Sequence, residues 1–153
     1  MKLTTLCYVI IQDKILLAKK KRGLGVGKWN GPGGKALPGE TPEQACSREF
    51  FEETGARVNN LEHRGIIEFI FENKPDWNQQ CHIFVSGSLI GEPQETQEML
   101  PAWFFLSEIP YHLMWEDDPI WLPGVVAGGK VSMRFIFNEA GNLTGCSNLE
   151  SGA

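Results

Sequence analysis

The 153-residue sequence has no paired cysteine motif, no long apolar run and no excess of positive charge. Its four cysteines, Cys7, Cys46, Cys81 and Cys146, form no Cys-x-x-Cys pair. This spacing argues against both a zinc knuckle and a disulfide framework. Cys7 and Cys81 lie in strand-like runs, so we expect small buried thiols there, as suits a reducing cytoplasm.

The apolar segments are too short to cross a membrane, which needs about 18 or more consecutive apolar residues. The first run, in MKLTTLCYVIIQDKILLAKK, is interrupted at Gln12 and lacks the layout of a signal peptide. The net charge of −5 argues against broad nucleic-acid binding, which requires a basic surface. We therefore expect a cytoplasmic protein with no membrane partner and no stable nucleic-acid partner.

The composition, 42% hydrophobic and 22% charged residues, is typical of a globular protein with a substantial core. The sequence contains no internal repeat, low-complexity tract or linker. We expect one domain over residues 1–153 and a monomer.

Apolar, β-branched-rich runs alternate with two helix patterns along the chain. We expect a hairpin turn at Gln12–Asp13, a glycine-rich loop over 23–34 and a turn over 139–142. The predicted strands cover 3–11, 14–19, 61–72, 80–90, 102–106 and 130–138, and the predicted helices cover 42–54 and 117–126. The order predicts an α+β fold in which a mixed β-sheet is sandwiched between helices.

The segment GKALPGETPEQACSREFFEETGA, residues 34–56, contains a helix with defined ends. Thr41 before Pro42 is typical of a helix start, and Gly55 of a helix end. At 100° per residue, the side chains at 49, 52 and 53 fall within an arc of about 100°. Phe51 lies on the opposite side, so we expect it to be buried in the core.

Three glutamates on one helix face, Glu49, Glu52 and Glu53, repel each other and weaken an isolated helix. Such a face favours a hard cation, Mg²⁺ or Mn²⁺, held together with substrate phosphates. A solvated acidic face is the alternative interpretation. Arg48 and Glu40 would hold the acids in ligand-competent rotamers, and an ordinary pair of Arg48 with Glu52 is compatible with this role.

Seven positions of this segment, from Gly34 to Gly55, fit one spaced pattern. It resembles the Nudix box, G-x5-E-x7-R-E-U-x-E-E-x-G-U, with Phe50 and Ala56 at the two apolar positions. Seven fixed matches would arise by chance in about one chain per million of this length. Three more segments, KKRGLGVGKWNGPGGK, QEMLPAWFFLSEIP and MWEDD, resemble the oxidised purine nucleoside triphosphate diphosphatases of the Nudix superfamily.

This resemblance implies Mg²⁺-dependent hydrolysis of nucleotides such as 8-oxo-dGTP to the monophosphate and pyrophosphate. It implies metal ligands at Glu49, Glu52, Glu53 and Glu98, with the backbone carbonyl of Gly33, and catalytic roles for Glu53, Glu52, Glu98 and Arg48. It also implies a substrate site that contains Thr5, Lys20, Asn30, Gly34, Lys35, Trp115, Asp117 and Asp118. Lys20 and Arg22 would offset phosphate charge.

The implied base pocket is chemically reasonable. Asn30 offers a donor and an acceptor to a purine edge, and Trp115 offers a flat face for stacking. Asp117 and Asp118 could share a proton, one acting as donor and the other as acceptor. The alternatives are a core tryptophan, a capping role for the two acids and a turn position for Asn30.

Other interpretations remain open at this stage. Glu92 and Glu95 compete with Glu98 for the metal, and the general base is either Glu53 or Glu98. The substrate could instead be ADP-ribose, a dinucleoside polyphosphate or an RNA 5′ end, and a non-catalytic nucleotide-binding domain is the remaining alternative. Leu24 and Pro32 stand where the oxidised-purine pattern has phenylalanines. The shape of the base pocket is therefore expected to differ from that pattern.

Overall fold

The computed structural model describes residues 1–149; residues 150–153 of the predicted domain lie outside the described part. The strands are β1 (Lys2–Ile11), β2 (Lys14–Lys20), β3 (Trp29–Asn30), β4 (Arg57–Asn59), β5 (Glu62–Phe71), β6 (Gln79–Ser86), β7 (Ser88–Ile90), β8 (Met99–Phe105), β9 (Val131–Phe137) and β10 (Leu143–Asn148). The helices are α1 (Pro42–Thr54) and α2 (Asp118–Val126), with 3-10 turns η1 (Pro75–Trp77), η2 (Leu106–Glu108) and η3 (Tyr111–Leu113).

An eight-stranded sheet forms the centre of the molecule, in the order β10-β9-β5-β6-β1-β2-β3, with β8 also paired to β2. The pairs β1–β6 and β5–β9 are parallel, and the remaining pairs of this sheet are antiparallel. Strands β4 and β7 form a separate two-stranded sheet. The predicted mixed sheet is therefore confirmed.

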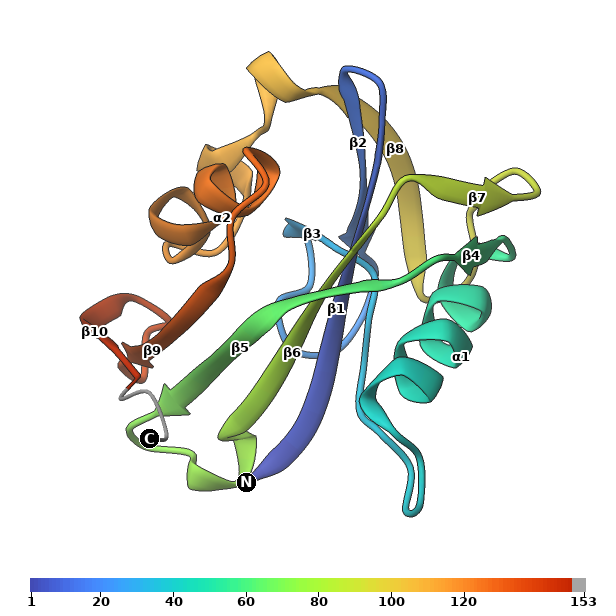
Figure 1. Cartoon of the computed structure of the whole chain (residues 1–153). Coiled ribbons are helices and arrows are strands. Elements are labelled where there is room, and N and C mark those ends of the chain that lie inside the picture. The colour runs from blue at the N-terminus through green and yellow to red at the C-terminus, as the bar shows by residue number, and fades with distance from the viewer. Residues whose placement is uncertain (150–153) are drawn as a thin grey trace.

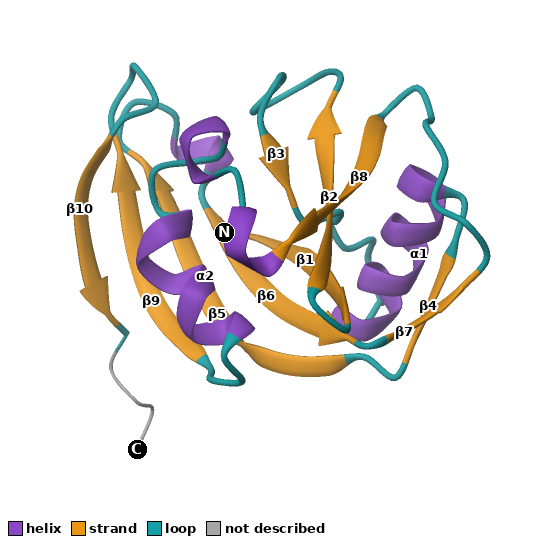
Figure 2. Cartoon of the chain, turned by 90° about the horizontal axis from the view of Figure 1, so that it is seen from above, coloured by secondary structure: helices purple, strands orange, loops and turns teal. Residues whose placement is uncertain are grey.

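The two helices cover opposite faces of the sheet, as Figures 1 and 2 show. Because side chains alternate along a strand, β1 sends Tyr8 into the core beneath α2 and its neighbours Cys7 and Val9 into the core beneath α1. The first core includes Trp121 and Leu122 of α2, and the second includes Phe50 of α1. The predicted sandwich is confirmed.

Several predicted strand limits are corrected by the structure. The run predicted as one strand over 80–90 is broken at Gly87, and its end, β7, pairs with β4 instead of the main sheet. The strand predicted over 102–106 begins earlier, at Met99. Three strands were not predicted, namely β3, β4 and β10, because each is short or lacks an apolar run. The turn over 139–142 is confirmed and leads into β10.

Helix α1 begins and ends where the sequence predicts. The Thr41 hydroxyl accepts from the Gln44 amide and the Gln44 side chain accepts from the Thr41 amide, while Gly55 ends the helix in a left-handed conformation. The prediction that Phe51 is buried is wrong, since it is 40% exposed and the Arg57 guanidinium lies over its ring. The side of α1 that faces the sheet includes Phe50 and Glu53, so the glutamate face and the core face overlap.

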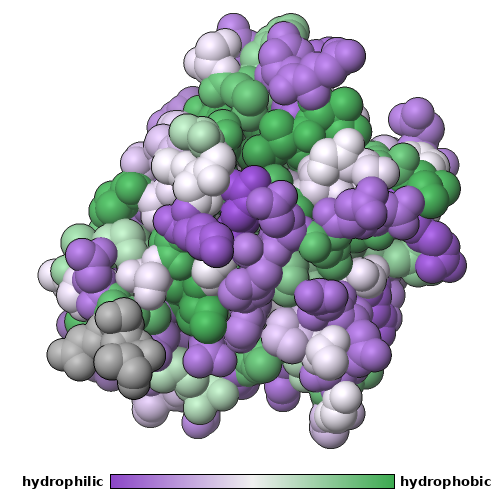
Figure 3. All heavy atoms as spheres, viewed as in Figure 1, coloured by the Kyte–Doolittle hydropathy of each residue, from purple (hydrophilic) through white to green (hydrophobic). Residues whose placement is uncertain are grey.

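The cysteines behave as predicted in the described part of the chain. All four are free thiols; Cys7, Cys46 and Cys81 are buried and Cys146 is exposed. No helix among the described residues is both long and apolar enough to cross a membrane. Hydrophilic and hydrophobic side chains are interspersed over the face shown in Figure 3.

Candidate functional site

Helix α1 places one carboxylate away from water. The Glu53 side chain is only 7% exposed, and its Oε2 accepts a hydrogen bond of 3.0 Å from the Gly33 amide. Burial, together with the neighbouring Glu49 carboxylate, raises the pKa of Glu53 to about 8. A carboxylate in this setting is neutralised either by a proton or by a cation.

The Arg48 guanidinium ties the start of the motif to its end. It donates to both carboxylate oxygens of Glu40, at 2.8 and 2.9 Å, and to the Lys35 carbonyl at 3.0 Å. It also donates to Glu49 at 2.9 Å and to Glu52 at 3.2 Å. These hydrogen bonds hold the pKa of Glu40 down at about 2. The predicted pair of Arg48 with Glu52 is thus present, and the role of Arg48 in holding metal ligands stays a prediction.

Gly33 brings the backbone too close to β1 for any side chain, and a side chain at Gly34 would displace the Glu49 carboxylate. A Cβ on Gly33 would lie 1.8 Å from the Thr5 carbonyl oxygen, and one on Gly34 would lie 2.5 Å from the Glu49 carboxyl carbon. The segment is held against β1, because the Thr5 amide donates to the Gly34 carbonyl at 2.9 Å. Glycine at these positions therefore places the Glu49 and Glu53 carboxylates beside this backbone.

The loop before β8 carries the other predicted acid. The Thr96 hydroxyl donates to the Glu53 carbonyl at 2.9 Å, which fixes the loop to α1. Glu98 forms an ion pair with Arg22, whose guanidinium lowers the pKa of Glu98, and Glu95 pairs with Lys21 at 2.6 Å. The position of the loop is compatible with a role for Glu98, which stays a prediction.

The predicted metal ligands do not yet form a closed site. Among residues 1–149, no three His, Cys, Asp or Glu side chains are arranged so that they could hold a metal ion. Arg48 engages Glu49 and Glu52, and Arg22 engages Glu98, so these carboxylates point at guanidinium groups. Metal binding would require the Glu49, Glu52 and Glu98 side chains to change partners.

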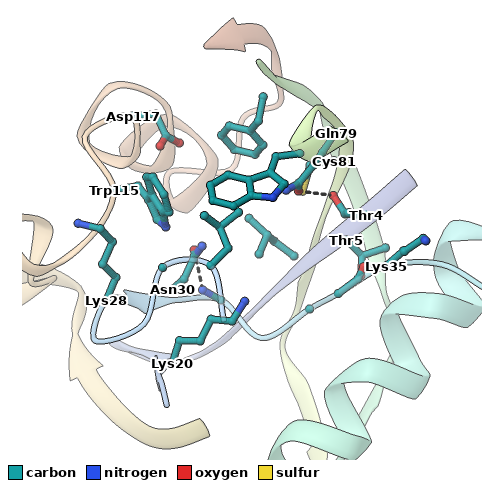
Figure 4. Close-up of a pocket in the computed structure, with 18 of the residues that line it drawn as sticks. Thr4, Thr5, Lys20, Lys28, Asn30, Lys35, Gln79, Cys81, Trp115 and Asp117 are labelled. Carbon is teal, nitrogen blue, oxygen red and sulfur yellow. Dashed lines mark hydrogen bonds between the residues drawn. The ribbon is translucent and has the colours of Figure 1, made fainter. Parts of the chain in front are cut away.

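A cavity of about 340 Å³ lies beside this segment. All of the predicted substrate residues line it, together with Gly33. They are Thr5, Lys20, Asn30, Gly34, Lys35, Trp115, Asp117 and Asp118. Figure 4 shows Trp115 and Lys28 on one side of the cavity, and Thr4, Gln79 and Cys81 on the other. The structure thus brings together residues from opposite ends of the sequence.

Trp115 forms part of the cavity wall and is supported by other aromatic rings. Its indole packs edge-on against Phe71 and Phe137, with ring centroids 6.2 and 5.3 Å away. The Lys28 ammonium lies 5.3 Å from its ring centroid, and a Cβ on Gly25 would lie 3.0 Å from its Nε1. Trp115 thus packs against the core and also lines the cavity.

Asp117 and Asp118 are each only 2% exposed. The Trp121 indole N–H donates to Asp117 Oδ2 at 2.7 Å, whereas Asp118 Oδ2 has no hydrogen-bond partner among the described residues. Burial raises the pKa of Asp117 to about 6, and burial with the adjacent Asp117 raises the pKa of Asp118 well above its usual range. Neither side chain caps α2, so the capping interpretation is wrong.

Asn30 belongs to β3, where it pairs with Ala18, so the alternative of a simple turn position is also wrong. Its Oδ1 accepts from the Tyr8 hydroxyl at 2.8 Å and from the Gly31 amide at 2.9 Å. These two bonds fix the side chain at the cavity wall.

Sequence reasoning missed four residues of this region: Tyr8, Trp77, Gln79 and Trp121. Trp77 and Gln79 line the cavity. The Tyr8 hydroxyl donates a hydrogen bond to Asn30, and the Trp121 indole donates one to Asp117. The four-residue spacing on α2 could have linked Trp121 to Asp117. No local signal relates Tyr8 to Asn30, because sheet pairing alone brings them together.

Comparison with known proteins identifies the family. The profile of the NUDIX domain family matches residues 1–125. The chain belongs to the Nudix family. It is 47% identical over 122 residues to the oxidized purine nucleoside triphosphate hydrolase of Danio rerio, covering 80% of this chain and 78% of that protein. It is 39% identical to the protein of the same name from Mus musculus, covering 97% and 95% of the two chains.

The solved structures place the fold in the same family. The crystal structure of the mutator MutT protein from Bacillus halodurans matches with a TM-score of 0.85 and 27% identity, covering 96% of this chain and 97% of that one. Within the Nudix family, residues 34–56 are the Nudix box, so α1 is the Nudix helix of this chain.

Proposed function

We propose that this Nudix protein hydrolyses oxidised purine nucleoside triphosphates such as 8-oxo-dGTP to the nucleoside monophosphate and pyrophosphate. The observation that carries the proposal is one continuous cavity. Gly33 and Gly34 line it on the side of the Nudix helix, and Trp115, Asp117 and Asp118 line it further along. A nucleotide bound there would place its phosphates near the glutamates and its base among the aromatic and acidic side chains.

The relatives support this substrate class. The proteins from Danio rerio and Mus musculus that are 47% and 39% identical to this chain are both named oxidized purine nucleoside triphosphate hydrolases. ADP-ribose, a dinucleoside polyphosphate or an RNA 5′ end would not require the group formed by Asn30, Trp115 and the two buried acids. The small nucleotide substrate and the acidic net charge of −5 also fit a protein that binds no nucleic acid and acts in the cytoplasm.

A divalent cation is the general cofactor of Nudix hydrolases, and we propose Mg²⁺, with Mn²⁺ as a substitute. The residues fit it, because Glu53 is a buried carboxylate beside a second carboxylate, and Gly34 lets the backbone approach the Glu49 carboxylate closely. Glu49, Glu52 and Glu53, with Glu98 and the Gly33 carbonyl, would hold the ion. When bound, it would polarise the phosphates and lower the pKa of a water molecule.

The chain's own residues supply the remaining roles. Arg48 holds Glu49 and Glu52 by hydrogen bonds in the metal-free protein, and Lys20, which lines the cavity, is close enough to favour the ionised forms of Glu53 and Glu98. Lys20 would offset phosphate charge in the same place. Glu53, or Glu98, would accept the proton of the attacking water.

The buried acids would read the purine. The raised pKa favours the protonated form of Asp118, which can donate, while Asp117, with a pKa of about 6, is mostly ionised at neutral pH and can accept. A donor next to an acceptor matches the edge of a purine that carries both. Trp115 would stack on the base.

The decisive experiment measures pyrophosphate release from 8-oxo-dGTP, dGTP and ADP-ribose in the presence of Mg²⁺. We expect the highest kcat/KM for 8-oxo-dGTP, and we expect Asp117→Asn and Asp118→Asn to lower its ratio to dGTP by about 5- to 150-fold, since mispairing at a buried polar site costs about 1–3 kcal/mol. A base-free triphosphate should be hydrolysed equally by all three proteins. Preferential cleavage of ADP-ribose, or an unchanged ratio in both variants, would contradict the proposal.

A further inference from the structure

Two of the three histidines in the sequence form a pair on the face of the sheet opposite the cavity. His63 Nε2 on β5 and His82 Nδ1 on β6 are 2.9 Å apart. His63 is exposed and His82 is half-buried. Cys81, the residue before His82, lines the cavity, and because side chains alternate along a strand, His82 lies on the other face. The pair therefore lies outside the site described above.

A β-bulge brings the two rings onto one face. The register between β5 and β6 shifts between His63 and Gly65, which makes Arg64 the extra residue of the bulge. The Arg64 guanidinium donates to two backbone carbonyls at the C-terminal end of α2, on the cavity side of the sheet. His63 packs edge-on against the Phe84 ring on the other side, with centroids 5.2 Å apart. Without the bulge, the alternation of side chains would place His63 on the face of the sheet away from His82.

The separation of the two rings suits a shared metal ion. An ion that holds imidazole nitrogens at about 2.0–2.1 Å, at bond angles between a right angle and the tetrahedral value, leaves them about 2.8–3.4 Å apart. The observed 2.9 Å lies in this range. The ring centroids are 5.1 Å apart, and the same geometry requires roughly 4.5–5.2 Å. A tilt of each ring is therefore sufficient to convert the hydrogen-bonded pair into a pair of metal ligands.

The surroundings of His82 favour the tautomer that a metal ligand needs. In the metal-free pair, one of the two facing nitrogens carries the proton between the rings. With the protons on His63 Nδ1 and His82 Nε2 instead, both facing nitrogens offer lone pairs. His82 Nε2 lies 3.4 Å from Gln80 Oε1, and a metal-bound histidine usually donates its second N–H to an oxygen in this way. Burial and the neighbouring His63 lower the pKa of His82, which favours the neutral, metal-binding ring.

We propose that His63 and His82 together bind a divalent transition-metal ion that prefers imidazole ligands, such as Ni²⁺, Cu²⁺ or Zn²⁺, with water in the remaining positions. This site is separate from the carboxylates of the Nudix helix, whose oxygen atoms suit Mg²⁺ or Mn²⁺. The ion would link β5 to β6, the two strands whose opposite face supplies Phe69, Phe71 and Cys81 to the cavity wall. Binding would therefore stabilise the folded protein without adding a group to the cavity.

The test is a calorimetric titration with Ni²⁺ in millimolar Mg²⁺, on proteins that carry Cys146→Ser to remove the exposed thiol. We expect one Ni²⁺ per chain. His63→Gln and His82→Gln should each weaken binding at least 10-fold, because a single imidazole loses the gain from the second, intramolecular ligand. Glutamine can still form a hydrogen bond with the remaining ring. The matched control is His112→Gln, at the third and exposed histidine, which should keep the wild-type affinity.

Wild-type affinity in either His63→Gln or His82→Gln, an equal loss in His112→Gln, or no Ni²⁺ binding by the wild type would each overturn the inference. If a histidine variant does not fold, Gln80→Leu removes the acceptor for His82 Nε2 and should weaken binding by about 10-fold. Unchanged affinity in that variant would also overturn it. Because no nucleotide is present, the result does not depend on the proposed hydrolysis, and Glu53→Gln should bind Ni²⁺ at this pair as the wild type does.

Discussion

Glu53, Asp117 and Asp118 are carboxyl groups that the fold keeps away from water. A buried carboxylate is costly unless it is protonated, paired or bound to a cation. For Glu53 the neighbours are another carboxylate and a backbone amide, and for Asp118 one oxygen has no partner among residues 1–149. Buried carboxyl groups with so few partners destabilise the fold, and this supports their proposed roles in binding and catalysis.

Glu53→Gln should separate charge from shape at the Nudix helix. The amide keeps the volume and can still accept from the Gly33 amide, but it loses the charge that a cation needs. We expect kcat/KM to fall by about 100-fold or more, with a melting temperature no lower than that of the wild type. Steady-state kinetics and thermal melts check this, with Glu43→Gln, exposed on the same helix, as the control. Near-wild-type turnover would remove Glu53 from the mechanism.

Asp118→Asn should change how stability depends on pH. In the wild type, the folded pKa of Asp117 is about 6, above the usual value of about 3.8 for an unfolded chain, and that of Asp118 is raised further. The folded state therefore holds these protons more tightly, and the resulting stabilisation is present below about pH 4 and lost as the pH rises through 6. Compared with the wild type, the variant should gain on the order of 1–3 kcal/mol between pH 4.5 and pH 7.5.

Urea unfolding of both proteins at these two pH values measures that change. Asp76→Asn, at an exposed position, is the control and should follow the wild-type profile. Parallel profiles for Asp118→Asn and the wild type would show that Asp118 titrates normally.

At the scale of elements, the Nudix helix is joined to the loop before it by a single guanidinium. Arg48 makes two hydrogen bonds to Glu40 and one to the Lys35 carbonyl, and Lys35 itself lines the cavity. One side chain thus links the orientation of Glu49 and Glu52 to the end of the cavity that Lys35 lines, where the phosphates of a nucleotide would bind. A planar, five-donor group is needed for this, because an ammonium group cannot form the paired bond to Glu40.

Arg48→Lys is expected to lower kcat/KM by about 10- to 100-fold, which is the usual effect of losing a partner that orients metal ligands. The melting temperature should fall by about 2–4 °C for each kcal/mol lost in a chain of this size. The control is Arg57→Lys, since Arg57 follows the same helix and lies over the exposed Phe51 ring. Full activity of Arg48→Lys would show that the charge alone is sufficient.

At the scale of the whole molecule, the candidate site crosses from one face of the sheet to the other. The aromatic and acidic part lies beneath α2, and the glycine segment leads past β1 to α1 on the opposite face. Ligand binding should therefore stabilise the molecule as a whole. The site connects the two cores, each of which is built on a different helix.

Divalent ions alone should raise the melting temperature of the metal-free protein. Without a cation, burial and the Glu49 carboxylate disfavour the ionised form of Glu53, so binding a cation favours the folded state, by about 2.7 kcal/mol when the ion is at 100 times its dissociation constant. This corresponds to a rise of about 5–10 °C for a chain of this size. Melts in EDTA and in Mg²⁺ or Mn²⁺ at matched ionic strength measure it. The rise should be smaller in Glu49→Gln, and an equal rise in both proteins would place the ion elsewhere.

The sequence by itself determined those features that depend on near neighbours along the chain. Helix α1 starts at Thr41 and ends at Gly55 as predicted, since capping and helical propensity act over a few residues. The spacing from Gly34 to Gly55 was sufficient to identify the Nudix box for the same reason. The resemblance also supplied the cavity residues, but only as a set of separate positions.

Only the tertiary structure decided which face of α1 meets the sheet and what surrounds the pocket. Phe51 is exposed while Glu53 is buried, because the sheet covers a side of α1 that the helix pattern alone did not distinguish. The bond from Tyr8 to Asn30 joins residues 22 positions apart through strand pairing. Burial and hydrogen bonding of this kind depend on groups brought together through space, so the raised pKa of Asp118 and the bond from Tyr8 to Asn30 follow from the fold and from no local pattern.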